Sequence, residues 1–114
     1  MPTNELIKGT LGTIILKLLQ ENGKMYGYDI TRVVKQRTDG KILLKEGSLY
    51  PALHKLLAEG LVKTEEMLIG NRPRVYYSLT PAGKKQIAIR TEELAGFMES
   101  IRTIMGIQTT LSHG

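Results

Sequence analysis

The sequence contains no cysteine, which excludes disulfide bonds, thiolate metal ligands and cysteine nucleophiles. It also has no apolar run of the roughly 18 residues that a membrane-spanning helix requires. The beginning of the chain, MPTNELIKGT, lacks the basic region and the uninterrupted apolar segment of a secretion signal. We therefore expect a cytoplasmic protein with no membrane partner.

The residue patterns of common active sites are absent as well. The sequence shows no grouping of serine, histidine and acid, no P-loop and no metal-ligand spacing. Its two histidines, His54 and His113, stand far apart and do not predict a metal site. We expect no catalytic residue, no metal and no cofactor.

What the sequence does contain is an excess of positive charge. Sixteen Lys and Arg residues against 11 Asp and Glu give a net charge of +5 in a chain of 114 residues, a length that suits one domain. The segment up to Lys85 holds 14 basic and 8 acidic residues, whereas acidic residues predominate after it. A basic front portion favours an anionic partner.

Apolar residues spaced by three and four predict two helices in the first third of the chain. The first runs from Asn4 to Asn22, and Gly9 and Gly12 inside it indicate the close approach of another backbone. The second begins at Tyr26 or Gly27 and ends at Arg37. Both helices have one apolar face for a shared core.

The next segments predict a short strand and a third helix. Lys41–Lys45 is apolar at its centre and too short for a helix, which is typical of a strand. A helix is expected from Ser48 to Glu59, with Ser48 as its N-cap and Gly60 ending it.

The remainder predicts a β-hairpin and a long helix. Segments 61–69 and 74–79 have strand composition, and Gly70-Asn71-Arg72-Pro73 between them predicts a turn with a basic tip. Thr80 is a suitable cap for a helix over Pro81–Met105.

This order predicts a mostly α-helical protein with a small β-hairpin, a winged helix-turn-helix whose third helix enters the DNA major groove. We expect a DNA-binding domain over residues 1–80, a dimerisation helix over 81–107 and a disordered tail over 108–114. The dimerisation helix carries an apolar seam that needs a partner, made of Leu94, Phe97, Met98, Ile101, Ile104 and Met105.

The candidate DNA contacts lie at the starts of two helices, along the third helix and at the hairpin tip. Basic residues at a turn tip suit the DNA backbone. Each candidate also has a structural alternative: Tyr50 can be core, Ser48 a cap, and His54 and Lys55 a solvated face. Lys8 and Lys24 are additional candidates for backbone contacts. The full set is Tyr28, Ser48, Tyr50, His54, Lys55, Arg72 and Arg74.

Four motifs in this order resemble the PadR-like transcriptional regulators: GYDI at 27–30, EGSLYPAL at 46–53, EGLV at 59–62 and RVYYSLTPAG at 74–83. The resemblance covers residues 5–85. It implies a dimeric bacterial DNA-binding repressor that a small molecule relieves. It also implies that the C-terminal helix packs on the partner's first helix, which adds Ile7 and Leu11 to the expected interface.

The chain departs from the family in two respects. It has room for one C-terminal helix, so it resembles the short subgroup. It has no tryptophan, whereas some short members use one to bind flat aromatic drugs, so that role is not carried over. Methionines and glycines at the expected interface nevertheless favour an adaptable effector site there.

A second function fits the same fold. Winged helices also serve as protein-interaction modules, in which the basic face meets an acidic protein. DNA binding requires Lys55, Arg72 and Arg74 on one face, whereas a protein module displays an exposed apolar patch.

Overall fold

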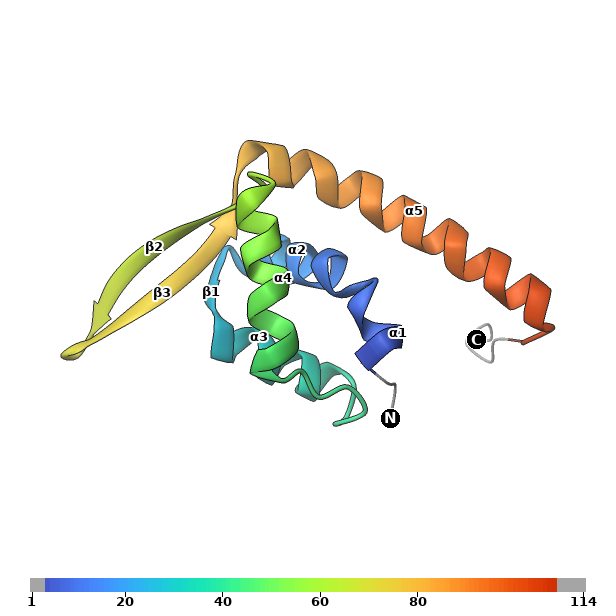
Figure 1. The fold of residues 1–114 in the computed structure, drawn as a ribbon, viewed down its shortest axis with the longest axis horizontal. Coiled ribbons are helices and arrows are strands. Elements are labelled where there is room, and N and C mark those ends of the chain that lie inside the picture. The colour runs from blue at the N-terminus through green and yellow to red at the C-terminus, as the bar shows by residue number, and fades with distance from the viewer. Residues whose placement is uncertain (1–3, 109–114) are drawn as a thin grey trace.

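The computed structural model describes residues 4–108, so the tail expected over 108–114 falls almost entirely outside the described residues. The helices pack together at one end of a small sheet, and the hairpin of this sheet and a long helix project in opposite directions (Figure 1). The extents are accordingly unequal, at 53 × 29 × 27 Å. None of the described helices is both long and apolar enough to cross a membrane. The elements are α1 (Asn4–Lys8), α2 (Leu11–Asn22), β1 (Lys24–Tyr26), α3 (Gly27–Arg37), α4 (Glu46–Ala58), β2 (Val62–Ile69), β3 (Arg72–Leu79) and α5 (Pro81–Met105).

The single first helix predicted from Asn4 to Asn22 is wrong, because the chain breaks between α1 and α2. Thr10 makes a local turn in which its backbone N–H and its hydroxyl both donate to the carbonyl of Ile7, at 3.0 and 3.1 Å. Such side-chain bonds to nearby backbone compete with the helix, and Gly9 beside Thr10 lowers helix propensity further. The carbonyl of Thr10 then accepts from Ile14 and starts α2.

The strand predicted at Lys41–Lys45 is also wrong, since this segment is an irregular loop. The backbone N–H of Ile42 donates to the Thr38 hydroxyl at 3.0 Å, and Leu44 is buried, so the apolar residues anchor a loop to the core. The third strand is instead β1, which pairs antiparallel with β3 to give the order β1-β3-β2.

Helix α4 begins two residues earlier than predicted, at Glu46, with Lys45 as its N-cap. Ser48 is therefore inside the first turn and is not the cap; its backbone N–H donates to the carbonyl of Lys45 at 3.0 Å. Leu49, Leu53 and Leu56 are buried, as the predicted spacing requires.

The hairpin is confirmed, but its turn is shorter than predicted. Ile69 pairs with Arg72, so the loop consists of Gly70 and Asn71 alone. Gly70 has a φ of +64° and Asn71 has no positive φ, the pattern of a type II′ turn, in which the first loop position favours glycine. Arg72 and Pro73 consequently belong to β3.

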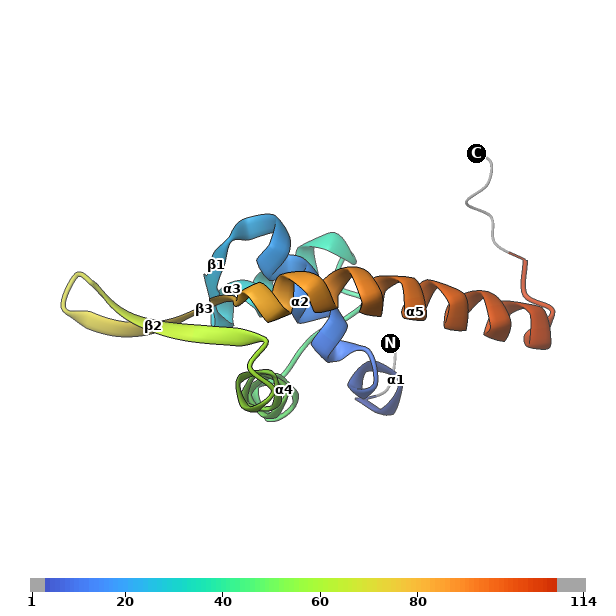
Figure 2. The same cartoon turned by 90° about the horizontal axis from the view of Figure 1, so that it is seen from above.

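The core lies where α2, α3 and α4 meet the inner face of the sheet, to which β3 contributes Tyr77 and Leu79. Helix α5 joins this core through its first turns only, where Gly83 and Ile87 are buried. Its predicted cap is confirmed, since the backbone N–H of Gly83 donates to the Thr80 hydroxyl at 3.0 Å. Beyond these turns α5 extends away from the other elements (Figure 2).

Candidate nucleic-acid interface

Helix α4 presents an outer face that is small, polar and basic. Opposite its buried leucines, the exposed residues are Gly47, Pro51, His54, Lys55 and Ala58. A B-DNA major groove is about 12 Å wide and a helix about 10–12 Å across, so short side chains on this face allow close approach. Of the predicted contacts on α4, His54 and Lys55 lie on this face.

Tyr50 does not lie on that outer face. Its ring is half-buried and packs on the core, and a Cβ added at Gly27 would lie 2.4 Å from its hydroxyl oxygen. Burial raises the pKa of the neighbouring Tyr77, and electrostatic interaction with Tyr50 adds to that rise. The Tyr50 hydroxyl is thus turned toward the start of α3, which favours packing over DNA contact.

A cluster of tyrosines that the sequence analysis missed lies on the outer face of the sheet and at the start of α3. The Tyr26 ring lies 5.5 Å from that of Tyr76 and 6.2 Å from that of Tyr28, measured between centroids. The Arg74 guanidinium carbon lies 4.7 Å from the centre of the Tyr26 ring, a cation–π contact. Tyr77 points to the core instead, because adjacent residues of a strand face opposite sides of the sheet.

The structure separates the two wing arginines that the sequence grouped. Arg72 is exposed next to the turn, whereas Arg74 is half-buried on Tyr26, further from the tip. Strand alternation places both on one face of β3. Arg72 is therefore free to reach a partner, and Arg74 stiffens the base of the wing.

Another predicted backbone contact, Lys24, has a partner within the chain. Its ammonium nitrogen donates to a carboxylate oxygen of Glu65 at 2.6 Å. This hydrogen bond and the Lys24 charge lower the pKa of Glu65, so the carboxylate stays ionised and offsets Lys24. Lys24 offers less positive charge to a polyanion than the sequence implied.

The candidates therefore fall into two groups. Four are exposed around α4 and the wing, and three are half-buried against the protein itself. No cluster of three or more potential metal ligands occurs within residues 4–108. Exposed are Tyr28, His54, Lys55 and Arg72; half-buried are Ser48, Tyr50 and Arg74.

The residues of the expected dimer seam also fall into an exposed group and a buried group. Leu94 is half-buried, and the apolar residues after it on α5 are exposed, with Phe97 62% and Ile104 76% accessible. The assignment of Ile7 and Leu11 to the seam needs correction, because both are buried in the chain's own core. Ile7 on α1 and Leu11 at the start of α2 belong to the same core cluster.

The paired helices α3 and α4, followed by the β2–β3 wing, define a winged helix-turn-helix protein. The wing is basic at its tip, and α4, the second helix of the helix-turn-helix, is exposed on one side. The family model of the PadR-like transcriptional regulators matches residues 15–89, more than half of the chain. The chain belongs to this family, and it is a regulator rather than an enzyme.

Known proteins resemble the chain in sequence and in structure. A transcriptional regulator from Clostridium thermocellum is 33% identical with a TM-score of 0.80, over 87% of this chain and 96% of that one. The negative transcriptional regulator PadR of Bacillus subtilis is 34% identical over 74 residues, which cover 64% of this chain and 40% of that protein. A crystal structure of Bacillus subtilis PadR with operator DNA gives 31% identity and a TM-score of 0.62, over 69% of this chain and 45% of that one.

Proposed function

We propose that the protein is a cytoplasmic, homodimeric repressor that binds specific operator DNA. The observation that carries this proposal is the exposed, basic outer face of α4 beside a wing with Arg72 at its tip. One relative supports it in two ways: Bacillus subtilis PadR is named as a negative transcriptional regulator, and its crystal structure contains operator DNA. The match to that complex covers 69% of this chain.

In this proposal α4 enters the major groove and the wing holds the flanking backbone. His54 and Lys55 lie where base edges or phosphates would meet α4, and Arg72 reaches the phosphates beside the groove. Tyr28, which is 62% exposed at the start of α3, offers a hydroxyl to the backbone. Phosphate contacts set the register, and only groups on α4 read the sequence.

The exposed apolar part of α5 is the reason for proposing a homodimer. The apolar stripe after Leu94 has nothing to pack on within residues 4–108, and such a surface needs a covering partner. A second α5 related by a two-fold axis would bury it. The two recognition helices then read half-sites about 34 Å apart, one turn of DNA, so the operator is palindromic.

An effector at this interface would act by changing the distance between the two α4 helices. Helix α5 is connected to α4 by an ion pair, in which Arg90 contacts Glu59 at the C-terminal end of α4 at 3.3 Å. A change in α5 packing therefore reaches the DNA-binding helix directly. A shift of a few ångströms prevents both half-sites from being engaged together.

A second candidate function, a protein-interaction module, is favoured by one observation. Leu68 is 73% exposed and Val75 43% exposed, and both lie on the wing face opposite the arginines, next to Pro73. Exposed apolar residues of this kind mark protein contacts. The replacement Leu68→Ser would weaken a protein complex while leaving electrostatic DNA binding unchanged.

Selection of bound fragments from the source genome tests the proposal. We expect an enriched palindrome whose half-sites are one helical turn apart, and retention that weakens steeply with salt. Recovery of fragments with no common sequence would contradict specific operator binding. The Lys84→Gln variant serves as a control. It removes one exposed positive charge from the start of α5, so its net charge equals that of a variant that loses one positive charge on α4.

A further inference from the structure

The aromatic ring of Tyr50 packs against the backbone of Gly27, the first residue of α3. A Cβ added at Gly27 would lie 2.9 Å from Cζ of Tyr50, 3.3 Å from Cε1 and closer still to the hydroxyl oxygen. All of these distances are shorter than the 3.4 Å at which ordinary contact begins. The edge of the ring therefore occupies the space that any side chain at position 27 would take.

Tyr50 also interacts with the sheet. It is half-buried and packs against the core. Burial raises the pKa of Tyr77 on β3, and the electrostatic interaction with Tyr50 adds to this rise, so the two phenols are near each other. Tyr77 in turn pairs with Met25 of β1, the strand that leads into Gly27. One side chain of α4 thus contacts the start of α3 and is near the strand behind it.

Tyr50 lies on the flank of α4, between the buried leucines and the outer face. It follows buried Leu49 directly, and successive residues of a helix are about 100° apart around its axis. His54 comes four residues later and lies above Tyr50 on the same side of the helix. A row of leucines holds α4 on the core, whereas a rigid ring on the flank also resists rotation of α4 about its axis.

We infer that Tyr50 is a positioning residue for DNA recognition. Its ring, packed against Gly27, sets the rotation of α4 and with it the direction in which His54 and Lys55 point. The structural part of this inference concerns the orientation of α4 alone. Its consequence for DNA rests on the proposed function.

The expected error from a disturbed contact is large on the scale of base recognition. The distance from a Cβ at Gly27 to the Tyr50 hydroxyl, 2.4 Å, falls short of ordinary contact at 3.4 Å by 1 Å. The surface of a helix lies about 5–6 Å from its axis, so a 1 Å displacement there corresponds to a rotation of about 10°. Recognition groups must be placed within about 0.5 Å. Phosphate contacts at the wing do not depend on this rotation, so sequence preference should be lost before general affinity.

Fluorescence anisotropy of the full-length protein measures this effect, with the duplex enriched in the selection above and an unrelated duplex of equal length. We expect Gly27→Ala to lower the ratio of the two affinities about tenfold, the contribution of one bidentate base contact. Affinity for the unrelated duplex should change by less than about twofold, because phosphate contacts dominate it. Circular dichroism of each variant confirms that it is folded.

Substitutions of Tyr50 separate positioning from direct DNA contact. Tyr50→Phe keeps the ring and should keep the affinity ratio, whereas Tyr50→Leu lacks the ring and should lower it. Gly27→Ala added to Tyr50→Leu should cause no further loss, because all three obstructing atoms are then absent. An equal loss in Tyr50→Phe and Tyr50→Leu would overturn the inference, since the hydroxyl would then act on DNA itself. An unchanged ratio in both Gly27→Ala and Tyr50→Leu would overturn it as well.

Crystal structures of the full-length wild-type and Gly27→Ala proteins without DNA test the inference independently of the proposed function. We expect α4 to be rotated by about 10° relative to α2 in Gly27→Ala. Gly47→Ala, whose Cβ would meet no other atom within 4 Å, should leave α4 in place. An unmoved α4 with the Tyr50 ring turned into solvent would overturn the inference. Absence of any preference for the selected duplex in the wild-type protein would contradict the proposed function, and the crystal structures would still decide the role of Tyr50.

Discussion

The replacement Gly83→Ala tests how α5 is fixed to the winged helix. Gly83 is buried in the first turn of α5. A Cβ at this position would lie 2.0 Å from the carbonyl oxygen of Leu61, whereas ordinary contact begins at 3.4 Å. The obstructing atom belongs to the backbone and accepts a hydrogen bond from the N–H of Thr80 at 3.1 Å. It cannot rotate away as the end of a side chain would.

Relief of this clash requires α5 to move away from Leu61 by about 1 Å or more in a close-packed region. Overpacking costs about 1–3 kcal/mol, and loss of the Thr80 hydrogen bond adds about 1 kcal/mol. We expect Gly83→Ala to lower the free energy of unfolding by about 2–4 kcal/mol. Urea denaturation followed by circular dichroism, at one protein concentration for every variant, measures the change.

Gly47→Ala provides the matched control. Gly47 is also in the first turn of a helix, but a Cβ there has no other atom within 4 Å. The alanine should leave stability unchanged or raise it by up to about 1 kcal/mol through helix propensity. A Gly83→Ala protein as stable as the Gly47→Ala protein would refute the close contact between α5 and Leu61.

Three further changes have defined outcomes. Arg72→Ala should weaken binding to every DNA sequence and reduce the salt slope by about one unit; an unchanged slope would refute the phosphate contact. Phe97→Asp should give folded monomers by sedimentation equilibrium, because Phe97 is exposed in the single chain, whereas Thr103→Asp on the opposite side of α5 should stay dimeric. Because burial raises the pKa of Tyr77, the folded state keeps its proton longer than the unfolded state, so stability falls as pH rises above the ordinary tyrosine pKa. Tyr77→Phe should lessen that alkaline loss, and an identical loss in both proteins would contradict the assignment.

Local sequence patterns were sufficient to predict an element where it is long and where capping or turn residues mark its ends. Helix α5 was predicted from its apolar spacing and from Thr80 before Pro81, and both features are present in the structure. The hairpin was predicted from a glycine turn between two strand-like segments, since the turn itself sets the pairing. In each case the signal lies within the element it specifies.

The remaining features depend on contacts between distant segments. Strand β1 has three residues, and its pairing with β3 fixes it, so no local periodicity marks it. Tyr50 is turned inward because Gly27, far away in the sequence, leaves space for its hydroxyl. The contact of Arg74 with Tyr26 likewise exists only once the sheet has formed. Such placements decide which candidate residues remain available to DNA.

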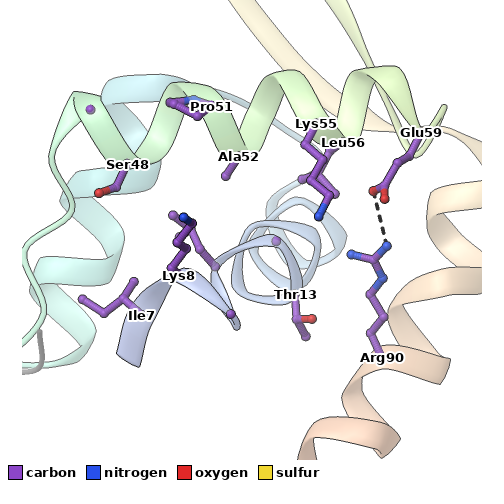
Figure 3. A pocket seen from close by; sticks show the side chains of 14 residues that line it. Ile7, Lys8, Thr13, Ser48, Pro51, Ala52, Lys55, Leu56, Glu59 and Arg90 are labelled. Atoms are coloured by element: carbon purple, nitrogen blue, oxygen red, sulfur yellow. Dashed lines mark hydrogen bonds and ion pairs between the residues drawn. The ribbon is translucent and has the colours of Figure 1, made fainter. Parts of the chain in front are cut away.

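A pocket lined by Lys8, Lys55 and Arg90 shows the same limitation. It combines residues from four helices, and only folding brings Lys8 close to α4 (Figure 3). In the sequence these cations are scattered charges.

Fluorescence anisotropy of a labelled DNA duplex, titrated with the purified protein at low ionic strength, tests most directly whether this chain binds DNA. We expect saturable binding with two chains for each palindromic duplex, and a clear loss of affinity when Lys55 and Arg72 are both replaced by alanine. The absence of binding to any duplex under these conditions would contradict DNA recognition by α4 and the wing.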